Sequence, residues 1–201
     1  AVAKACHKVS HYDRSLTHLL QSWTTYSYTT TLVGMCASAS QISPVFDRKQ
    51  VVQNRLRAQA LPDSDASFLH DRAFDALTDR LRDIRRNFPL ALHTGYTGDD
   101  DRLTAYRKAG GIEQLLHMGP ARALVDQRTG ITPVLGDEEA LPFFGGELDL
   151  ITSCGNLYTV NDLPGALIQI MRALKPDGAF VGVLPGGETL YELRQAMMTA
   201  E

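Results

Sequence analysis

The stretch Phe88-Pro-Leu-Ala-Leu-His-Thr-Gly-Tyr-Thr-Gly-Asp99 decides the fold of this 201-residue chain. Pro89 ends a preceding helix, residues 90–94 form a short apolar strand, and Gly95 and Gly98 mark a turn before the next helix. A strand followed by a glycine turn and a helix is the opening unit of a nucleotide-binding α/β domain. The sequence therefore predicts an α/β protein whose sheet is built around this strand.

The segments on both sides of this stretch continue the same alternation. Phe74, Leu77, Leu81 and Ile84 recur at helical spacing and predict an amphipathic helix over residues 66–86. Another helix is expected over residues 163–174, with Lys175-Pro-Asp-Gly178 as its stop and turn, and a last helix from about residue 187 to the end. The predicted strands are residues 90–94, 112–118, 132–135, 148–153 and 179–184. This order predicts a Rossmann-like, doubly wound parallel sheet.

The composition is that of an ordinary globular domain, with 44% hydrophobic and 21% charged residues. No apolar run approaches the roughly 20 residues of a membrane-spanning helix, so we expect at most peripheral membrane association. The three cysteines, Cys6, Cys36 and Cys154, lack metal-ligand spacing and are interpreted as reduced thiols without a metal. The formal net charge is −3, and we expect no nucleic-acid partner.

Residues 1–46 differ in kind from the rest of the chain. They carry Lys4, Lys8 and Arg14 against the single acid Asp13, and they are rich in Ser and Thr. This composition is typical of an organelle transit peptide, and it equally suits a docking arm that packs on the domain or on a neighbour. We therefore divide the chain into residues 1–46, a pair of N-terminal helices over residues 47–88, and a sheet domain over residues 89–201. Within the second of these segments, the charged stretch 47–57 is expected to be an exposed, solvated helix or arm.

Several phrases resemble one known family, the class I S-adenosylmethionine (SAM) methyltransferases. Within that family they are most similar to the branch of mitochondrial complex I assembly factors that hydroxylate a protein arginine, and to its bacterial methyltransferase relatives. The phrases are Asp83-Ile-Arg-Arg-Asn-Phe-Pro-Leu-Ala-Leu92, Asp137-Glu-Glu-Ala-Leu-Pro-Phe143, Val160-Asn-Asp-Leu-Pro164, Leu174-Lys-Pro-Asp-Gly178 and Gly187-Glu-Thr-Leu-Tyr-Glu-Leu-Arg194.

The resemblance implies SAM as the cofactor and Gly95, Gly98, Asp137 and Glu138 as the residues that touch it, with no catalytic residue assigned. In the family the first strand ends in an acid that holds the methionine amino group, but this chain has His93 there. The next strand ends in His117-Met-Gly-Pro120, where the family has an acid that binds the ribose. Two of three polar anchors are thus replaced, which predicts a degenerate SAM site.

The resemblance also implies a setting and partners. The family builds seven strands, whereas this chain ends at Glu201 in the helix after the fifth predicted strand. An uncovered fifth strand would expose unpaired backbone groups, so we expect either the N-terminal segment, through residues 24–32, or another polypeptide to cover it. Two functions stay open: a SAM-dependent protein-modifying enzyme, and a catalytically inactive structural subunit or scaffold. For both we expect protein partners in a larger mitochondrial complex linked to complex I, in the matrix or on the matrix side of the inner membrane.

Overall fold

A computed structural model describes residues 44–60 and 67–200. The chain divides into two units at residues 42 and 43, and the described residues belong to the second unit. The predictions for the N-terminal segment, including the strand over residues 24–32 and the thiols of Cys6 and Cys36, lie outside the described residues.

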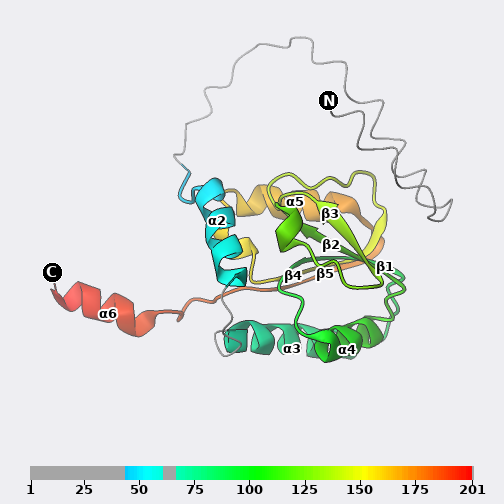
Figure 1. Cartoon of the computed structure of the whole chain (residues 1–201), viewed down its shortest axis with the longest axis horizontal. Coiled ribbons are helices and arrows are strands. Elements are labelled where there is room, and N and C mark those ends of the chain that lie inside the picture. The colour runs from blue at the N-terminus through cyan, green and yellow to red at the C-terminus, as the bar shows by residue number, and fades with distance from the viewer. Residues whose placement is uncertain (1–43, 61–66, 201) are drawn as a thin grey trace, which may run out of the picture. The chain divides into compact units, whose positions relative to one another are not determined.

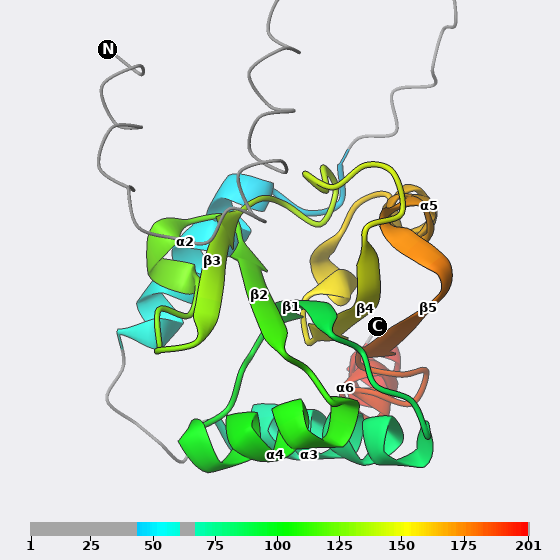
Figure 2. The ribbon, with the colours of Figure 1, turned by 90° about the vertical axis from the view of Figure 1, so that its right-hand side faces the viewer.

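The described domain is built on one sheet of five parallel strands in the order β3-β2-β1-β4-β5. The strands are β1 (Leu90–Gly95), β2 (Gln114–Gly119), β3 (Ile131–Leu135), β4 (Leu148–Cys154) and β5 (Leu174–Val183). Figure 2 shows β1 between β2 and β4, near the middle of the sheet. All seven residues of β4 are buried, as expected for a strand covered on both faces. The predicted doubly wound, Rossmann-like sheet is confirmed.

Helices cover both faces of this sheet (Figure 1). Helices α3 (Phe68–Asp83) and α4 (Asp100–Gly110) lie on one face and α5 (Leu163–Ala173) on the other, while α2 (Arg48–Gln59) lies beside the carboxyl ends of the strands. The amphipathic pattern of α3 places Phe74, Leu77 and Leu81 in the core. A last helix, α6 (Tyr191–Ala200), follows β5 and has no buried residue.

Each face of the sheet has its own apolar core. On the α3 and α4 side, helix residues pack against Ala91, Leu115 and Leu150 of three neighbouring strands. On the α5 side, Ile170 packs against Leu92 and Ile151, which alternate with the first set along the strands. The sheet is therefore held from both faces, and only its ends remain available for a ligand site.

The turn predicted at Lys175–Gly178 lies inside β5, as an irregularity of the strand. Leu148 pairs with Leu174, and Leu150 pairs with Ala179. Four residues of β5, 175–178, therefore lie opposite a single residue of β4, Asp149. Asp177 has a positive φ of 68° within this bulge, a conformation that a turn readily accepts. Lys175 Nζ contacts Asp149 Oδ1 of β4 at 2.9 Å and fixes the bulge against the sheet.

Candidate functional site

A cavity of about 730 Å³ lies at the carboxyl ends of the central strands. Its lining includes the last residues of three strands, Gly95 of β1, Gly119 of β2 and Cys154 of β4. The chain leaves β1 and β4 in opposite directions along the sheet at this point, and ligands of open α/β sheets bind at such a crevice. Further walls come from α2, through Arg55, Ala58 and Gln59, and from the 3-10 turn η3 (Arg122–Leu124).

Gly95 is the predicted cofactor residue that lines this cavity, and its glycine character is required. Its φ is +99°, and a Cβ atom there would lie 2.1 Å from the carbonyl oxygen of Cys154. Gly98 also has a positive φ, +67°, but it lies against Arg102 and Phe74 and is not among the described residues that line the cavity. The turn between β1 and α4 therefore uses positive φ angles at both of its glycines.

Asp137 and Glu138 follow β3, and arginines of α2 hold both carboxylates. Nη2 of Arg48 donates to Oδ1 of Asp137 at 2.7 Å and to Oε2 of Glu138 at 2.5 Å. Burial alone would lower the pKa of Arg48, but these hydrogen bonds and the two negative charges raise it above its usual value. Glu138 is only 3% exposed, and neither acid is among the described residues that line the cavity.

His93 is a buried structural residue of β1 and is only 1% exposed. Its Nδ1 lies 2.8 Å from the Thr152 hydroxyl, and its Nε2 lies 2.8 Å from the Tyr96 carbonyl oxygen. The Tyr106 hydroxyl lies 2.7 Å from the same Thr152 oxygen and extends the network. Burial, reinforced by nearby His117, lowers the pKa of His93 to about 3, so the ring is neutral at physiological pH.

His117 has the same role on the neighbouring strand β2. Its Nδ1 accepts a hydrogen bond from the backbone N–H of Asp126 at 2.6 Å, so its Nε2 carries the proton and donates to the Gly95 carbonyl oxygen at 2.9 Å. Burial lowers the pKa of His117 as well. The two histidines thus hold consecutive carbonyls of the glycine turn, Gly95 and Tyr96, where the family pattern places acids for the ligand.

A carboxylate does line the cavity beyond β2, but it has a partner within the chain. Asp126 lies in the loop after η3, and Arg128 Nε donates to its two oxygens at 3.1 and 2.8 Å. Burial would raise the pKa of Asp126, but the hydrogen bonds and charge of Arg128 lower it. Arg128 Nη2 also donates to Thr97 Oγ1 at 2.9 Å and to the Gly98 carbonyl at 3.1 Å, which ties this loop to the glycine turn.

The residues around the cavity do not fit SAM in the way the resemblance implies. SAM carries a cationic sulfonium and a cationic ammonium group, which require acceptors or negative charge nearby. Asp126, Asp137 and Glu138 are each paired with an arginine of the same chain. His93 and His117 are neutral and bonded to the turn, so no unpaired carboxylate faces the cavity among the described residues.

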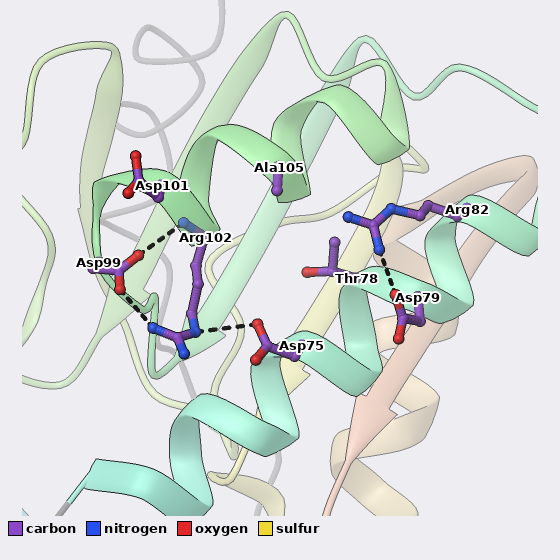
Figure 3. A pocket seen from close by; sticks show the side chains of 8 residues that line it. All are labelled: Asp75, Thr78, Asp79, Arg82, Asp99, Asp101, Arg102 and Ala105. Carbon is purple, nitrogen blue, oxygen red and sulfur yellow. Dashed lines mark hydrogen bonds and ion pairs between the residues drawn. The ribbon is translucent and has the colours of Figure 1, made fainter. Parts of the chain in front are cut away.

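A second cavity, of about 410 Å³, lies between α3 and α4 (Figure 3). Its polar side chains pair with one another: Arg102 contacts Asp99 and Asp75, and Arg82 contacts Asp79. Asp99 is also the N-cap of α4 and accepts from the Arg102 backbone N–H at 2.8 Å, so the three acids at residues 99–101 lie at the start of this helix. This cavity holds none of the residues predicted to bind a cofactor.

Asn156 and Tyr158, in the segment that leaves β4, both line the cavity. Sequence analysis assigned no role to Thr152 or Arg128, and it placed Arg48 and Arg55 in a solvated stretch. That prediction is wrong for these two arginines, whose side chains are 18% and 22% exposed because they fold back onto Asp137, Glu138 and Thr159. Cys154 is a buried free thiol whose pKa burial raises to about 12.

Two kinds of feature are absent from the residues that the structure covers. Residues 44–60 and 67–200 contain no helix that is both long and apolar enough to traverse a bilayer. The same residues contain no cluster of three His, Cys, Asp or Glu side chains suited to hold a metal ion.

Comparison with known proteins gives related sequences and similar folds. Residues 108–182 match the methyltransferase domain family. The mitochondrial arginine-hydroxylase NDUFAF5 of Danio rerio is 37% identical over 169 residues, which cover 82% of this chain and 52% of the relative. The human protein of that name is 39% identical over 163 residues, covering 78% and 46%. A solved SAM-dependent methyltransferase from Thermotoga maritima is 18% identical, with a TM-score of 0.48 over 64% of this chain and 60% of the other.

The chain thus spans about half the length of the curated relatives it matches. Its sheet has the strand order β3-β2-β1-β4-β5, with the first strand followed by a glycine turn and a helix. The domain match and the related sequences agree with this architecture. The sheet has the Rossmann-like order of a class I methyltransferase fold, and the sequence is similar to the methyltransferase domain family and to the mitochondrial arginine-hydroxylases named above.

Proposed function

We propose that this chain is a mitochondrial factor or subunit that works in the assembly of respiratory complex I through protein contacts, with a degenerate SAM site. Its sequence relatives are named mitochondrial arginine-hydroxylases, which supports the compartment and a protein partner. We place it in the matrix or on the matrix side of the inner membrane. Its partners are protein subunits of a larger mitochondrial complex.

One observation carries the statement about the SAM site. Arg48 bonds to both Asp137 and Glu138, at 2.7 and 2.5 Å, and Arg55 lies 3.6 Å from Glu138, so the two acids implied to meet the cofactor are already paired within the chain. A ligand group must displace a charge-assisted hydrogen bond to reach either acid, which costs roughly 1.5–3 kcal/mol for each contact. At about tenfold in affinity per 1.4 kcal/mol, this weakens cofactor binding by one or more orders of magnitude.

The test is complementation in cells that lack the protein, with complex I measured by blue-native electrophoresis. The variant Ala123→Trp fills part of the cavity, because Ala123 lines it and is exposed enough to accept a larger side chain. An enzyme needs this cavity for its cofactor, whereas a scaffold does not. We expect wild type and A123W to restore complex I equally. The assembly role would be contradicted if cells that lack the protein kept normal complex I. It would also be contradicted if the wild-type protein failed to restore complex I in those cells.

A second candidate function, a SAM-dependent protein-modifying enzyme, is favoured by the cavity itself. A glycine turn with positive φ and a space of about 730 Å³ at the carboxyl ends of the strands are what a cofactor site needs. Calorimetric titration of the full chain with SAM decides between the two. No heat at ligand concentrations of about 1 mM supports the degenerate site, and stoichiometric binding at micromolar concentrations supports the enzyme.

A further inference from the structure

Helix α2 is attached to the rest of the domain mainly by polar contacts. None of its residues is fully buried, and Val51, Val52 and Leu56 are half-buried. The specific contacts come from two arginines at helical spacing on one face, Arg48 and Arg55, which both reach across to residues about 90 to 110 positions later in the chain. Polar contacts with little apolar burial make an element that can open locally while the core stays folded.

Two of the three guanidinium nitrogens of Arg48 meet acceptors, while its Nε is buried and has no hydrogen-bond partner among the described residues. One nitrogen, Nη2, donates to Asp137 and Glu138, and the other, Nη1, donates to the Thr159 carbonyl oxygen at 3.2 Å. Arg55 adds a second positive charge, with Nη1 at 3.6 Å from Oε1 of Glu138 and Nη2 donating to the Thr159 hydroxyl at 2.9 Å. Two arginines therefore balance two carboxylates, and a planar group with several fixed donors suits these acceptors better than an ammonium group does.

The same contacts set the shape of the large cavity. Arg55, Ala58 and Gln59 of α2 form one of its walls. Glu138 lies directly behind that wall, because its Oε1 accepts a hydrogen bond at 2.8 Å from Nδ2 of Asn156, which lines the cavity. When α2 lifts away, the cavity loses a wall and gains an unneutralised carboxylate.

We propose that Asp137, Glu138 and Thr159 form a guanidinium-binding site, which Arg48 fills from within the chain, and that α2 is thereby a strap that closes the cavity. The ligand class of the site is a guanidinium group, and Arg48 is its occupant in this chain. The inference stands on the contacts of α2 and does not depend on the role in complex I assembly.

Hydrogen exchange of the full chain tests the strap. In Arg48→Ala, the α2 amides over residues 52–59 should exchange at least about tenfold faster than in wild type, while β1 and β4 stay protected. Arg57→Ala is the matched control, since Arg57 lies on the same helix and its side chain is exposed. Glu138 keeps Asn156 and Arg55 as partners in R48A, so we expect this variant to fold.

Chemical rescue tests the site. Residues 156–159, which carry acceptors for Arg48, should also exchange faster in R48A than in wild type. Millimolar ethylguanidinium should restore their protection in R48A and should leave wild type and R57A unchanged. Equal exchange of α2 in R48A and wild type would overturn the strap, and so would loss of protection throughout β1 and β4. No rescue by ethylguanidinium, or the same rescue by ethylammonium, would overturn the guanidinium site. None of these results bears on complementation of complex I, so the two proposals fail separately.

Discussion

His93 and His117 are register partners on β1 and β2, and their rings stack with the centroids 5.6 Å apart. Thr152 is the register partner of His93 on the other side, in β4. A row across three strands thus carries two neutral imidazoles and a hydroxyl beneath the glycine turn. Because each imidazole bonds to a carbonyl of that turn, the row fixes the floor of the cavity from inside the protein.

Acid should destabilise the protein through this pair. The pKa of His93 falls from its ordinary value of 6.5 to about 3 on folding, so the unfolded chain binds more protons between these values. The stability contributed by the neutral ring is present above pH 6.5 and is lost as the pH falls toward 3, at about 1.4 kcal/mol per pH unit for this one residue. Urea unfolding at several pH values measures the slope.

His93→Gln removes the titrating group and should reduce that slope, whatever it does to stability at neutral pH. His70→Gln is the control, because His70 is exposed on α3 and also contacts Tyr96. An unchanged slope in H93Q would show that other groups govern the acid response.

Replacing Gly95 with alanine should strongly destabilise the domain. The φ of +99° disfavours any side chain, and the new Cβ would lie 2.1 Å from the Cys154 carbonyl oxygen, so β1 and β4 must separate. We expect a loss of at least about 3 kcal/mol in the free energy of unfolding. Gly186→Ala is the matched control, since its Cβ would meet nothing within 4 Å. Similar unfolding midpoints for both variants would contradict the strained turn.

Thr152→Val tests the buried hydroxyl that bridges Tyr106 and His93. Valine has nearly the same shape, but it leaves both the Tyr106 hydroxyl and His93 Nδ1 without this partner in a fully buried place. An unsatisfied buried group costs roughly 1–3 kcal/mol, so we expect T152V to lose about 3 kcal/mol by denaturant unfolding. Thr132→Val, at an exposed position of β3, should change stability by less than about 0.5 kcal/mol. A near-neutral T152V would mean that the network contributes little.

Arg128→Gln should loosen the glycine turn more than it lowers global stability. The arginine links Asp126, Thr97 and the Gly98 carbonyl, but its side chain is 29% exposed, so solvent screens some of the gain. We expect a loss of about 1 kcal/mol together with faster hydrogen exchange over residues 96–99. Arg122→Gln, an exposed arginine in η3 whose side chain makes no described contact with the turn, is the comparison. Unchanged exchange in R128Q would remove Arg128 as the tie between the two loops.

The periodic segments of the chain could be predicted because their pattern is local. The spacing of Phe74, Leu77 and Leu81 predicts a helix that faces a core, and the structure buries all three in α3. The predicted strands agree with β1 to β4 within two residues at each end. The start of β5 differs by five residues, because its bulge contains the sequence Lys175-Pro-Asp-Gly178, which also suits an ordinary turn.

Contacts between polar side chains that lie far apart in the sequence could not be predicted from local patterns. Arg48 and Asp137 lie 89 residues apart, and His93 and Thr152 lie 59 residues apart. A basic side chain in a polar helix has the same local pattern whether it meets solvent or a carboxylate. Its partner depends on how strands and helices pack, which a count of charges does not record.

The sequence by itself determined the sheet and its helices, because apolar spacing dictates which face of each element must leave water. It also determined that His93 replaces an acid at the end of the first strand, since this is a matter of residue identity. Only the tertiary structure decided what the remaining acids do. Strand order and helix packing bring Arg48 to Asp137 and Glu138, and Arg128 to Asp126, and a carboxylate paired at such short range is no longer free to attract a cationic ligand.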